Sequence, residues 1–177
     1  MHVTDDLIKI FNDCFGFEYS TRLVRGGDEP LYLPASESDS HNLLYFANGF
    51  FSSALHECAH WLLAGDARRK LVDFGYWYVP DGRTMAEQLL FQQVEVKPQA
   101  LEWVLSQASA YPFQLSIDNL NGEDVDVAPF KQAVYAQVKA YCALGLPKRA
   151  QILYIALSVF YGTLGDLNIK AFDYNSL

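Results

Sequence analysis

The 177-residue sequence has few cysteines, no long run of apolar residues and a deficit of positive charge. Its three cysteines, Cys14, Cys58 and Cys142, are odd in number and far apart, which argues against a disulfide scaffold and is typical of a reducing compartment. No stretch approaches the ~20 apolar residues that a membrane-spanning helix needs, so we expect no membrane partner. Thirteen Lys and Arg against 21 Asp and Glu give a net charge of −8. This charge disfavours a direct nucleic-acid partner, because phosphate binding needs a basic surface.

Length and composition predict one domain over residues 1–177. Hydrophobic residues make up 51% of the chain, and a chain of this length buries roughly two thirds of the surface that it exposes when unfolded, so its core needs no covalent support. Asp5 and Asp6 lie where a signal peptide would be basic. These features predict a cytoplasmic protein and leave its oligomeric state open.

Hydrophobic periodicity predicts an α+β fold that is rich in helices and has a small β-sheet. Pro98 interrupts one helical pattern, and because proline removes a backbone donor we expect a kink there, or one helix ending and another beginning. Gly26 and Gly27 predict a turn between the first two strands. The expected helices cover 4–15, 52–64, 84–110, 130–144 and 149–162, and the expected strands lie at 23–24, 31–33, 43–47 and 71–79.

The most informative pattern is His56-Glu57-Cys58-Ala59-His60, within the helix expected over 52–64. Residues four apart on an α-helix lie about 40° apart around its axis, so both imidazoles project from one face and can bind one divalent transition metal. Cys58 is about 200° from His56 and is expected to point away. Shuffled chains of this composition contain the pattern in roughly 0.003 of cases, which makes a chance pair of histidines a poor explanation. The pattern predicts a metal site on a His-Glu-x-x-His helix, within a metallopeptidase-like arrangement of helices.

Glu95 is the favoured third ligand. It lies between Val94 and Val96 next to Pro98, where a carboxylate is costly to bury unless it has a charged partner. The alternative is a solvated Glu95, or one that forms a salt bridge with Lys97.

Other candidate ligands are less favourable. Glu87 and Glu102 have the pattern of exposed helix acids, His2 is close to the terminus and expected to be loose, and His41 lies in a polar loop. Two histidines and one carboxylate would leave open positions on the metal, which is a catalytic rather than a closed structural arrangement.

The ligand set His56, His60 and Glu95 supports two chemistries. With zinc, Glu57 would act as the general base on a water at the metal, which gives a zinc metallopeptidase. With Fe(II), the open positions would accept dioxygen and substrate. A binding module with a structural metal is a third possibility, and ligation alone does not separate the three.

Longer segments carry a more specific signal than the motif. They are Asp28-Glu29-Pro30-Leu31-Tyr32-Leu33-Pro34, His56-Glu57 with His60-Trp61, Ala67-Arg68-Arg69 with Leu71-Val72-Asp73-Phe74-Gly75-Tyr76-Trp77-Tyr78, Pro80-Asp81-Gly82-Arg83, Val94-Glu95-Val96-Lys97-Pro98-Gln99-Ala100-Leu101, and Tyr111-Pro112-Phe113 with Asp118-Asn119-Leu120. Through these segments nearly the whole chain resembles the bacterial elongation factor P (EF-P) hydroxylases.

This resemblance implies a non-haem iron protein-lysine hydroxylase. It implies Fe(II) held by His56, His60 and Glu95, with dioxygen as co-substrate and an unidentified reductant. The implied reaction hydroxylates the β-lysylated lysine of EF-P, the last step in the modification of that translation factor, on a fold unlike the usual 2-oxoglutarate oxygenase barrel. Glu57 would then orient a ligand, transfer a proton or contact the substrate, and we count it as a catalytic candidate.

Candidate substrate contacts surround the aromatic strand expected over 71–79. We hypothesise that Asp73 or Asp81 pairs with a substrate ammonium while an aromatic face packs on its methylene groups. Tyr76, Tyr78 and Arg83 complete this predicted set. The alternative is a core strand whose acids cap turns.

Two arginines beyond the motif helix have a separate interpretation. Arg68 and Arg69 could dock an acidic protein partner, or could simply be solvated at the end of the helix.

Overall fold

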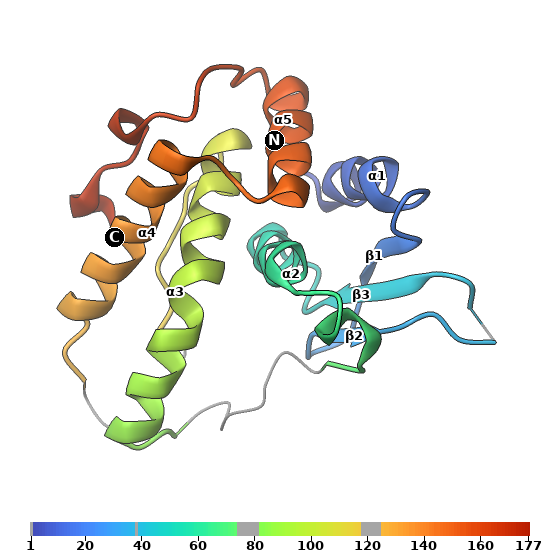
Figure 1. Ribbon diagram of the computed structural model, residues 1–177, viewed down its shortest axis with the longest axis horizontal. Coiled ribbons are helices and arrows are strands. Elements are labelled where there is room, and N and C mark those ends of the chain that lie inside the picture. The colour runs from blue at the N-terminus through green and yellow to red at the C-terminus, as the bar shows by residue number, and fades with distance from the viewer. Residues whose placement is uncertain (1, 38, 74–81, 118–124) are drawn as a thin grey trace.

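The computed structural model describes residues 2–37, 39–73, 82–117 and 125–177 (Figure 1). The α+β prediction, with many helices and a small sheet, is confirmed. The assignment of residues 1–177 to one domain stays a prediction. No described helix has both the length and the apolar character needed to cross a membrane. In chain order the elements are α1 (Thr4–Phe15), β1 (Thr21–Arg25), β2 (Leu31–Leu33), β3 (Asn42–Phe46), α2 (Phe51–Leu63), η1 (Arg68–Lys70), α3 (Met85–Ala108), α4 (Ala128–Leu144), α5 (Lys148–Tyr161), η2 (Ile169–Ala171) and η3 (Tyr174–Ser176).

Helix α1 forms because its apolar residues recur at helical spacing and are buried together. Leu7, Phe11 and Phe15 are fully buried on one face of α1. The rings of Phe11 and Phe15 pack against Trp61, with centroids 5.2 and 4.9 Å away. Trp61 follows His60 directly, so this aromatic cluster fixes the last turns of α2.

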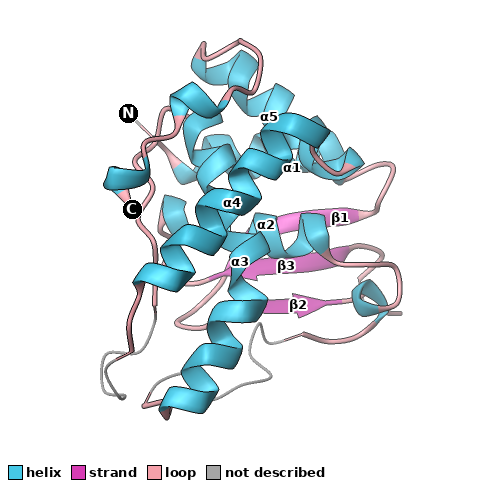
Figure 2. Ribbon diagram, turned by 60° about the vertical axis from the view of Figure 1, so that its left-hand side comes forward, coloured by secondary structure: helices cyan, strands magenta, loops and turns pink. Residues whose placement is uncertain are grey.

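The sheet has the strand order β1-β3-β2, with β3 parallel to β1 and antiparallel to β2 (Figure 2). The turn at Gly26 and Gly27 therefore does not close a hairpin between paired strands. Instead Gly26 donates its N–H to the carbonyl of Phe46 and extends the β1–β3 ladder, and a side chain at Gly26 would meet that oxygen at 3.0 Å. Because β3 leads directly into α2, this ladder sets where α2 begins.

Helix α2 contacts β3 on one side and α3 on the other (Figure 1). Helix α3 begins with a capping box between Thr84 and Glu87, and then continues for 24 residues. Of the two alternatives expected at Pro98, a helix break is excluded. Pro98 is buried, and the packing of α3 against α2, α4 and α5 offsets the loss of one backbone donor.

The strand expected over 71–79 is described only as far as Asp73. Asp73 forms an isolated bridge with Tyr32 of β2, with N–H to carbonyl distances of 2.7 and 3.0 Å. The remainder of that predicted strand lies outside the described residues.

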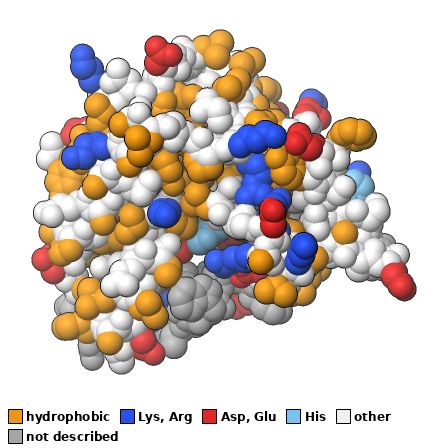
Figure 3. All heavy atoms as spheres, in the orientation of Figure 1, with side chains coloured by type: hydrophobic (Ala, Val, Ile, Leu, Met, Phe, Trp, Pro, Cys, Tyr) orange, Lys and Arg blue, Asp and Glu red, His pale blue; other side chains and the backbone are white. Residues whose placement is uncertain are grey.

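One face of the molecule is hollowed beside α2. In the view of Figure 3, histidine atoms are visible in a hollow, and Lys and Arg side chains gather next to it.

Candidate metal centre

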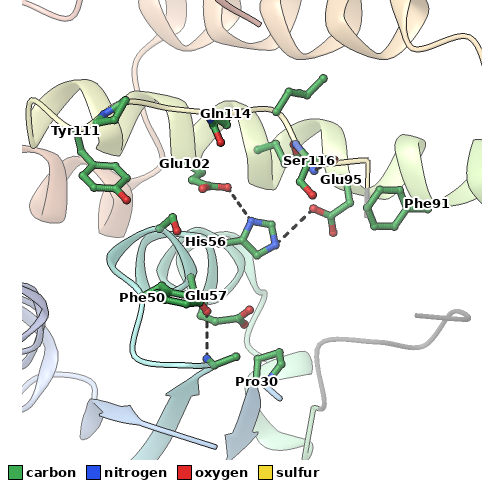
Figure 4. Close-up of a pocket in the computed structure, with 16 residues that line it drawn as sticks. Pro30, Phe50, His56, Glu57, Phe91, Glu95, Glu102, Tyr111, Gln114 and Ser116 are labelled. Atoms are coloured by element: carbon green, nitrogen blue, oxygen red, sulfur yellow. Dashed lines mark hydrogen bonds and ion pairs between the residues drawn. The ribbon is translucent and has the colours of Figure 1, made fainter. Parts of the chain in front are cut away.

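Helices α2 and α3 bring together the three side chains that the sequence nominates as ligands. His56 and His60 lie one turn apart on α2. Glu95 projects from α3 towards His56 (Figure 4). The two Nε2 atoms are 3.0 Å apart, and Glu95 oxygens lie 3.3 Å from His60 Nε2 and 3.7 Å from His56 Nε2. One donor atom from each residue can be chosen so that all lie within 4.8 Å of one another.

These separations fit a single transition-metal ion. At metal–ligand distances of ~2.1 Å, neighbouring ligands are ~3.0 Å apart in an octahedron and ~3.4 Å apart in a tetrahedron. Two imidazole nitrogens and one carboxylate oxygen suit zinc or Fe(II) and leave positions open. Glu95 is only 1% exposed, and a buried carboxylate needs a positive partner such as an ion or a protonated histidine.

Glu102 is a candidate site residue for which the sequence-based prediction is wrong. It is not an exposed acid: it is 9% exposed, and its Oε2 lies 2.8 Å from His56 Nδ1 (Figure 4). A carboxylate at this position accepts the Nδ1–H of His56 and leaves the Nε2 lone pair for an ion, because the two ring nitrogens share one proton in neutral histidine. The missed signal is the spacing: Glu102 follows Glu95 by seven residues, two turns of the same helix face.

The face of α3 that carries Glu95 and Glu102 is polar and buried along its whole length. Such a face is unusual, because a helix of a globular domain normally buries an apolar stripe. The alternating steps of four and three residues keep the members on one side of the helix. They are Gln88, Gln92, Glu95, Gln99, Glu102 and Ser106, all at most 9% exposed.

Without an ion, the cluster is held together by charge. Burial is the largest influence on His56 and lowers its pKa, but Glu102, Glu95 and Glu57 outweigh it and raise this pKa to about 10. Burial also acts first on Glu95 and raises its pKa, but His60, His56 and a hydrogen bond from Gln99 lower it to about 2. A protonated His56 beside an ionised Glu95 thus supplies the positive charge that a metal ion would otherwise bring.

Glu57 lies between two cavities. It is 8% exposed and lines both the main cavity and a smaller one that contains His60. Burial raises the pKa of Glu57, while His56 and His60 oppose the shift. A carboxyl group that takes up a proton more readily than usual, next to both candidate ligands, is suited to proton transfer.

The main cavity has a volume of about 670 Å³ and lies between α2, α3 and the segment 111–116. No Lys or Arg is among the described residues that line it. Its chemistry is therefore anionic and aromatic. The acids are Glu57, Glu95 and Glu102, the aromatic residues are Phe50, Phe91 and Tyr111, and the opposite wall is formed by Pro112, Gln114, Leu115 and Ser116.

The wall segment is attached to the polar face of α3. The Gln99 amide donates to the Ser116 carbonyl at 2.8 Å and accepts the Ser116 N–H at 3.0 Å. Gln88 and Arg83 both donate to the carbonyl of Ile117, at 2.9 and 3.1 Å. Since Gln99 also bonds Glu95, one side chain holds both the wall and a candidate ligand.

Of the residues predicted to contact the substrate, Arg83 and Asp73 are among the described residues, and they occupy different places. Arg83 is fully buried, bonded to Gln88 at 2.8 Å, with its guanidinium 4.1 Å from the centroid of the Phe91 ring. Asp73 lines the smaller cavity beside His60 and accepts a bond from Arg68 at 2.5 Å. Tyr76, Tyr78 and Asp81 lie outside the described residues.

The expectation that His2 is loose is wrong. Its Nε2 lies 2.6 Å from the Ser109 carbonyl, and its ring packs against Phe51, Tyr111 and Tyr161 with centroids 5.2, 5.1 and 5.1 Å away. This packing connects the N-terminal segment to the first residue of α2 and to a residue of the cavity wall.

Comparison with known proteins extends over almost the whole chain. A family model described as elongation factor P hydroxylase matches residues 10–172. A protein of Haemophilus influenzae named elongation factor P lysine hydroxylase is 60% identical over 172 residues, which cover 97% of each chain. The resemblance seen in the sequence is thereby confirmed, and the chain belongs to the elongation factor P hydroxylase family.

Proposed function

We propose that this protein hydroxylates the β-lysylated lysine of EF-P in the cytoplasm, as the last step in the modification of that factor, with Fe(II) bound by His56, His60 and Glu95. Membership of the family and the name of the Haemophilus influenzae relative support EF-P lysine hydroxylation as the reaction. The observation that carries the proposal is the cluster of two imidazoles and one carboxylate at an anionic cavity.

The residues around the ligands would prepare the site. When bound, Fe(II) supplies the activation of dioxygen that oxygen insertion into a C–H bond requires. Glu102 would hold His56 in the tautomer that presents Nε2, and Gln99 would hold Glu95. Glu57 would carry a proton between the two cavities that it lines.

The main cavity suits an extended cationic side chain. Its three glutamates attract ammonium groups, and none of its described lining residues is a Lys or Arg. Phe50, Phe91 and Tyr111 offer apolar surface for methylene groups. A β-lysylated lysine combines both features, because it carries ammonium groups on a long aliphatic chain.

The proposal can be tested by the intact mass of β-lysylated EF-P after co-expression with this protein. We expect a gain of one oxygen atom with the parent protein and no gain with His60→Ala. Glu37→Gln, an exposed substitution away from the cavity, serves as the matched control and should retain the gain.

Two results would argue for another function. Cleavage of a protein substrate that depends on zinc and on Glu57 would favour the metallopeptidase. If soluble, iron-loaded protein adds no oxygen to β-lysylated EF-P, the hydroxylase proposal is rejected.

A further inference from the structure

Basic side chains gather at the end of α2, one turn beyond the candidate metal centre. They come from η1 and from the start of α5, which face each other across a groove of about 380 Å³. On the face in Figure 3, Lys and Arg side chains gather beside the hollow. Arg69, Lys148 and Arg149 line this groove, and Arg68 and Lys70 flank Arg69 in η1. We call these five residues together the basic groove.

The basic groove has more positively charged side chains than it has acidic neighbours. Arg68 pairs with Asp73, Arg69 with Asp66, and Lys148 lies 3.7 Å from Glu18. Among the described residues, these five basic side chains pair with three acids, on a chain whose net charge is −8. The local excess is positive where the protein as a whole is negative.

The floor of the basic groove is rigid. Arg149 donates to the carbonyls of Leu62 and Ala64, at 3.0 and 2.5 Å, and its guanidinium lies 4.9 Å from the centroid of the Trp61 ring. Arg69 lies 5.9 Å from the same centroid, and its buried Nε has no hydrogen-bond partner within the described residues. Guanidinium groups fixed in this way lose little conformational entropy when they bind an anion.

The basic groove adjoins the candidate metal centre. Ala64 and Arg69 line the groove and also line the smaller cavity that contains His60 and Glu57. Ala64 follows His60 by one helical turn, or ~6 Å along the axis. A segment bound in the groove would therefore lie close to a side chain bound at the metal centre.

We propose that the basic groove docks an acidic segment of the protein substrate while the target lysine occupies the main cavity. The inference rests on the proposed function, in which that substrate is EF-P. The groove would take carboxylates and the cavity would take ammonium groups, so the two opposite charges would set the orientation of the substrate. Guanidinium groups also bind phosphate, but the groove is short, Asp66 lines it and Asp73 pairs with the neighbouring Arg68, which disfavours a nucleic-acid strand.

The test reverses two exposed charges in one double variant, called the rim variant: Lys148→Glu, which lines the groove, and Lys70→Glu, which lies next to Arg69 in η1. We expect its KM for β-lysylated EF-P to rise about tenfold at low ionic strength, with an unchanged kcat. Its KM for a short peptide that carries the same modified lysine should stay unchanged, since the peptide lacks the acidic segment. The matched control, Lys139→Glu with Lys170→Glu, makes the same charge change on other exposed positions and should leave both KM values near those of the parent protein.

Binding measured without turnover separates this inference from the proposed function. Calorimetry should give a weaker dissociation constant for EF-P with the rim variant than with the control, and the difference should shrink in high salt. If oxygen is never added but this difference persists, the proposed function fails and the docking surface stands. Equal dissociation constants for the two variants would overturn the docking proposal, and so would tight binding of a single-stranded RNA that only the rim variant loses.

Discussion

Replacing Glu102 with glutamine removes the negative charge beside His56 and keeps the size of the side chain. In the metal-free protein, burial is the largest influence and lowers the pKa of His56, but the three glutamates together, Glu102 foremost, raise it to about 10. An ion that binds at neutral pH must therefore displace a proton. In the parent protein the apparent metal affinity should rise about tenfold for each pH unit until the pH approaches that pKa.

The charge of Glu102 acts more strongly on an ion than on the proton that the ion replaces. A divalent ion carries twice the charge of a proton, so at similar distances the loss of the carboxylate weakens metal binding more than proton binding. The glutamine amide can also donate to Nδ1, which favours the tautomer of His56 that has its proton on Nε2. Partners of this kind are worth about 10–100-fold in metal affinity, and we expect a loss in that range at neutral pH.

Competition between the protein and a chromogenic chelator for Zn²⁺ or Co²⁺ measures this loss. The Glu102→Gln variant should also show a flatter dependence of affinity on pH, because the pKa of its His56 is lower. Glu37→Gln, the same substitution in an exposed loop, should match the parent protein. An unchanged affinity together with an unchanged pH dependence in Glu102→Gln would refute the reasoning.

Three further predictions concern stability and the cavity wall. The metal-free protein should lose stability as pH rises from 6.5 towards about 10. Because the pKa of His56 is raised to about 10 in the folded state, its protonation stabilises that state fully only below 6.5, the ordinary pKa of histidine in the unfolded chain. A free energy of unfolding, measured by urea titration, that stays constant over this pH range would contradict the prediction. Arg149→Met removes two bonds to carbonyls at the end of α2 and should lower the free energy of unfolding by about 1–3 kcal/mol, which an unchanged denaturation midpoint would disprove. Gln99→Leu removes both hydrogen bonds to Ser116 and the donor to Glu95, so the substrate KM and the metal dissociation constant should both rise several-fold. A metal affinity equal to that of the parent protein would show that Gln99 does not help Glu95 to bind the ion.

The helices could be predicted because their signals are local in sequence. Leu7, Phe11 and Phe15 mark one face of α1 by spacing alone, and they are buried together. The strand order could not be predicted in the same way. It depends on contacts such as the one between Gly26 and the Phe46 carbonyl, which join residues 20 positions apart.

The candidate site was only partly accessible from sequence. Glu95 can be predicted as a ligand because a carboxylate between two valines is costly to bury. The sequence instead predicts an exposed Glu102, because the burial of Glu102 depends on how α2 packs against α3. The wall segment 111–116 has no periodic pattern. Its position depends on the hydrogen bonds of Gln99 and Gln88, which spacing along the chain does not reveal.

The buried polar face of α3 makes stability and activity compete within one helix. Helix α3 adds buried apolar residues such as Leu101, Val104 and Leu105 to the core, but it also buries a polar face where a central helix of 24 residues would ordinarily bury more apolar side chains. Gln92 shows the cost, because its buried Nε2 has no hydrogen-bond partner within the described residues. Changes such as Gln92→Leu would therefore be expected to strengthen the metal-free fold. Conversely, an ion that binds only the folded state would restore part of the stability that the polar face gives up, so the supply of metal would govern how much folded protein a cell maintains.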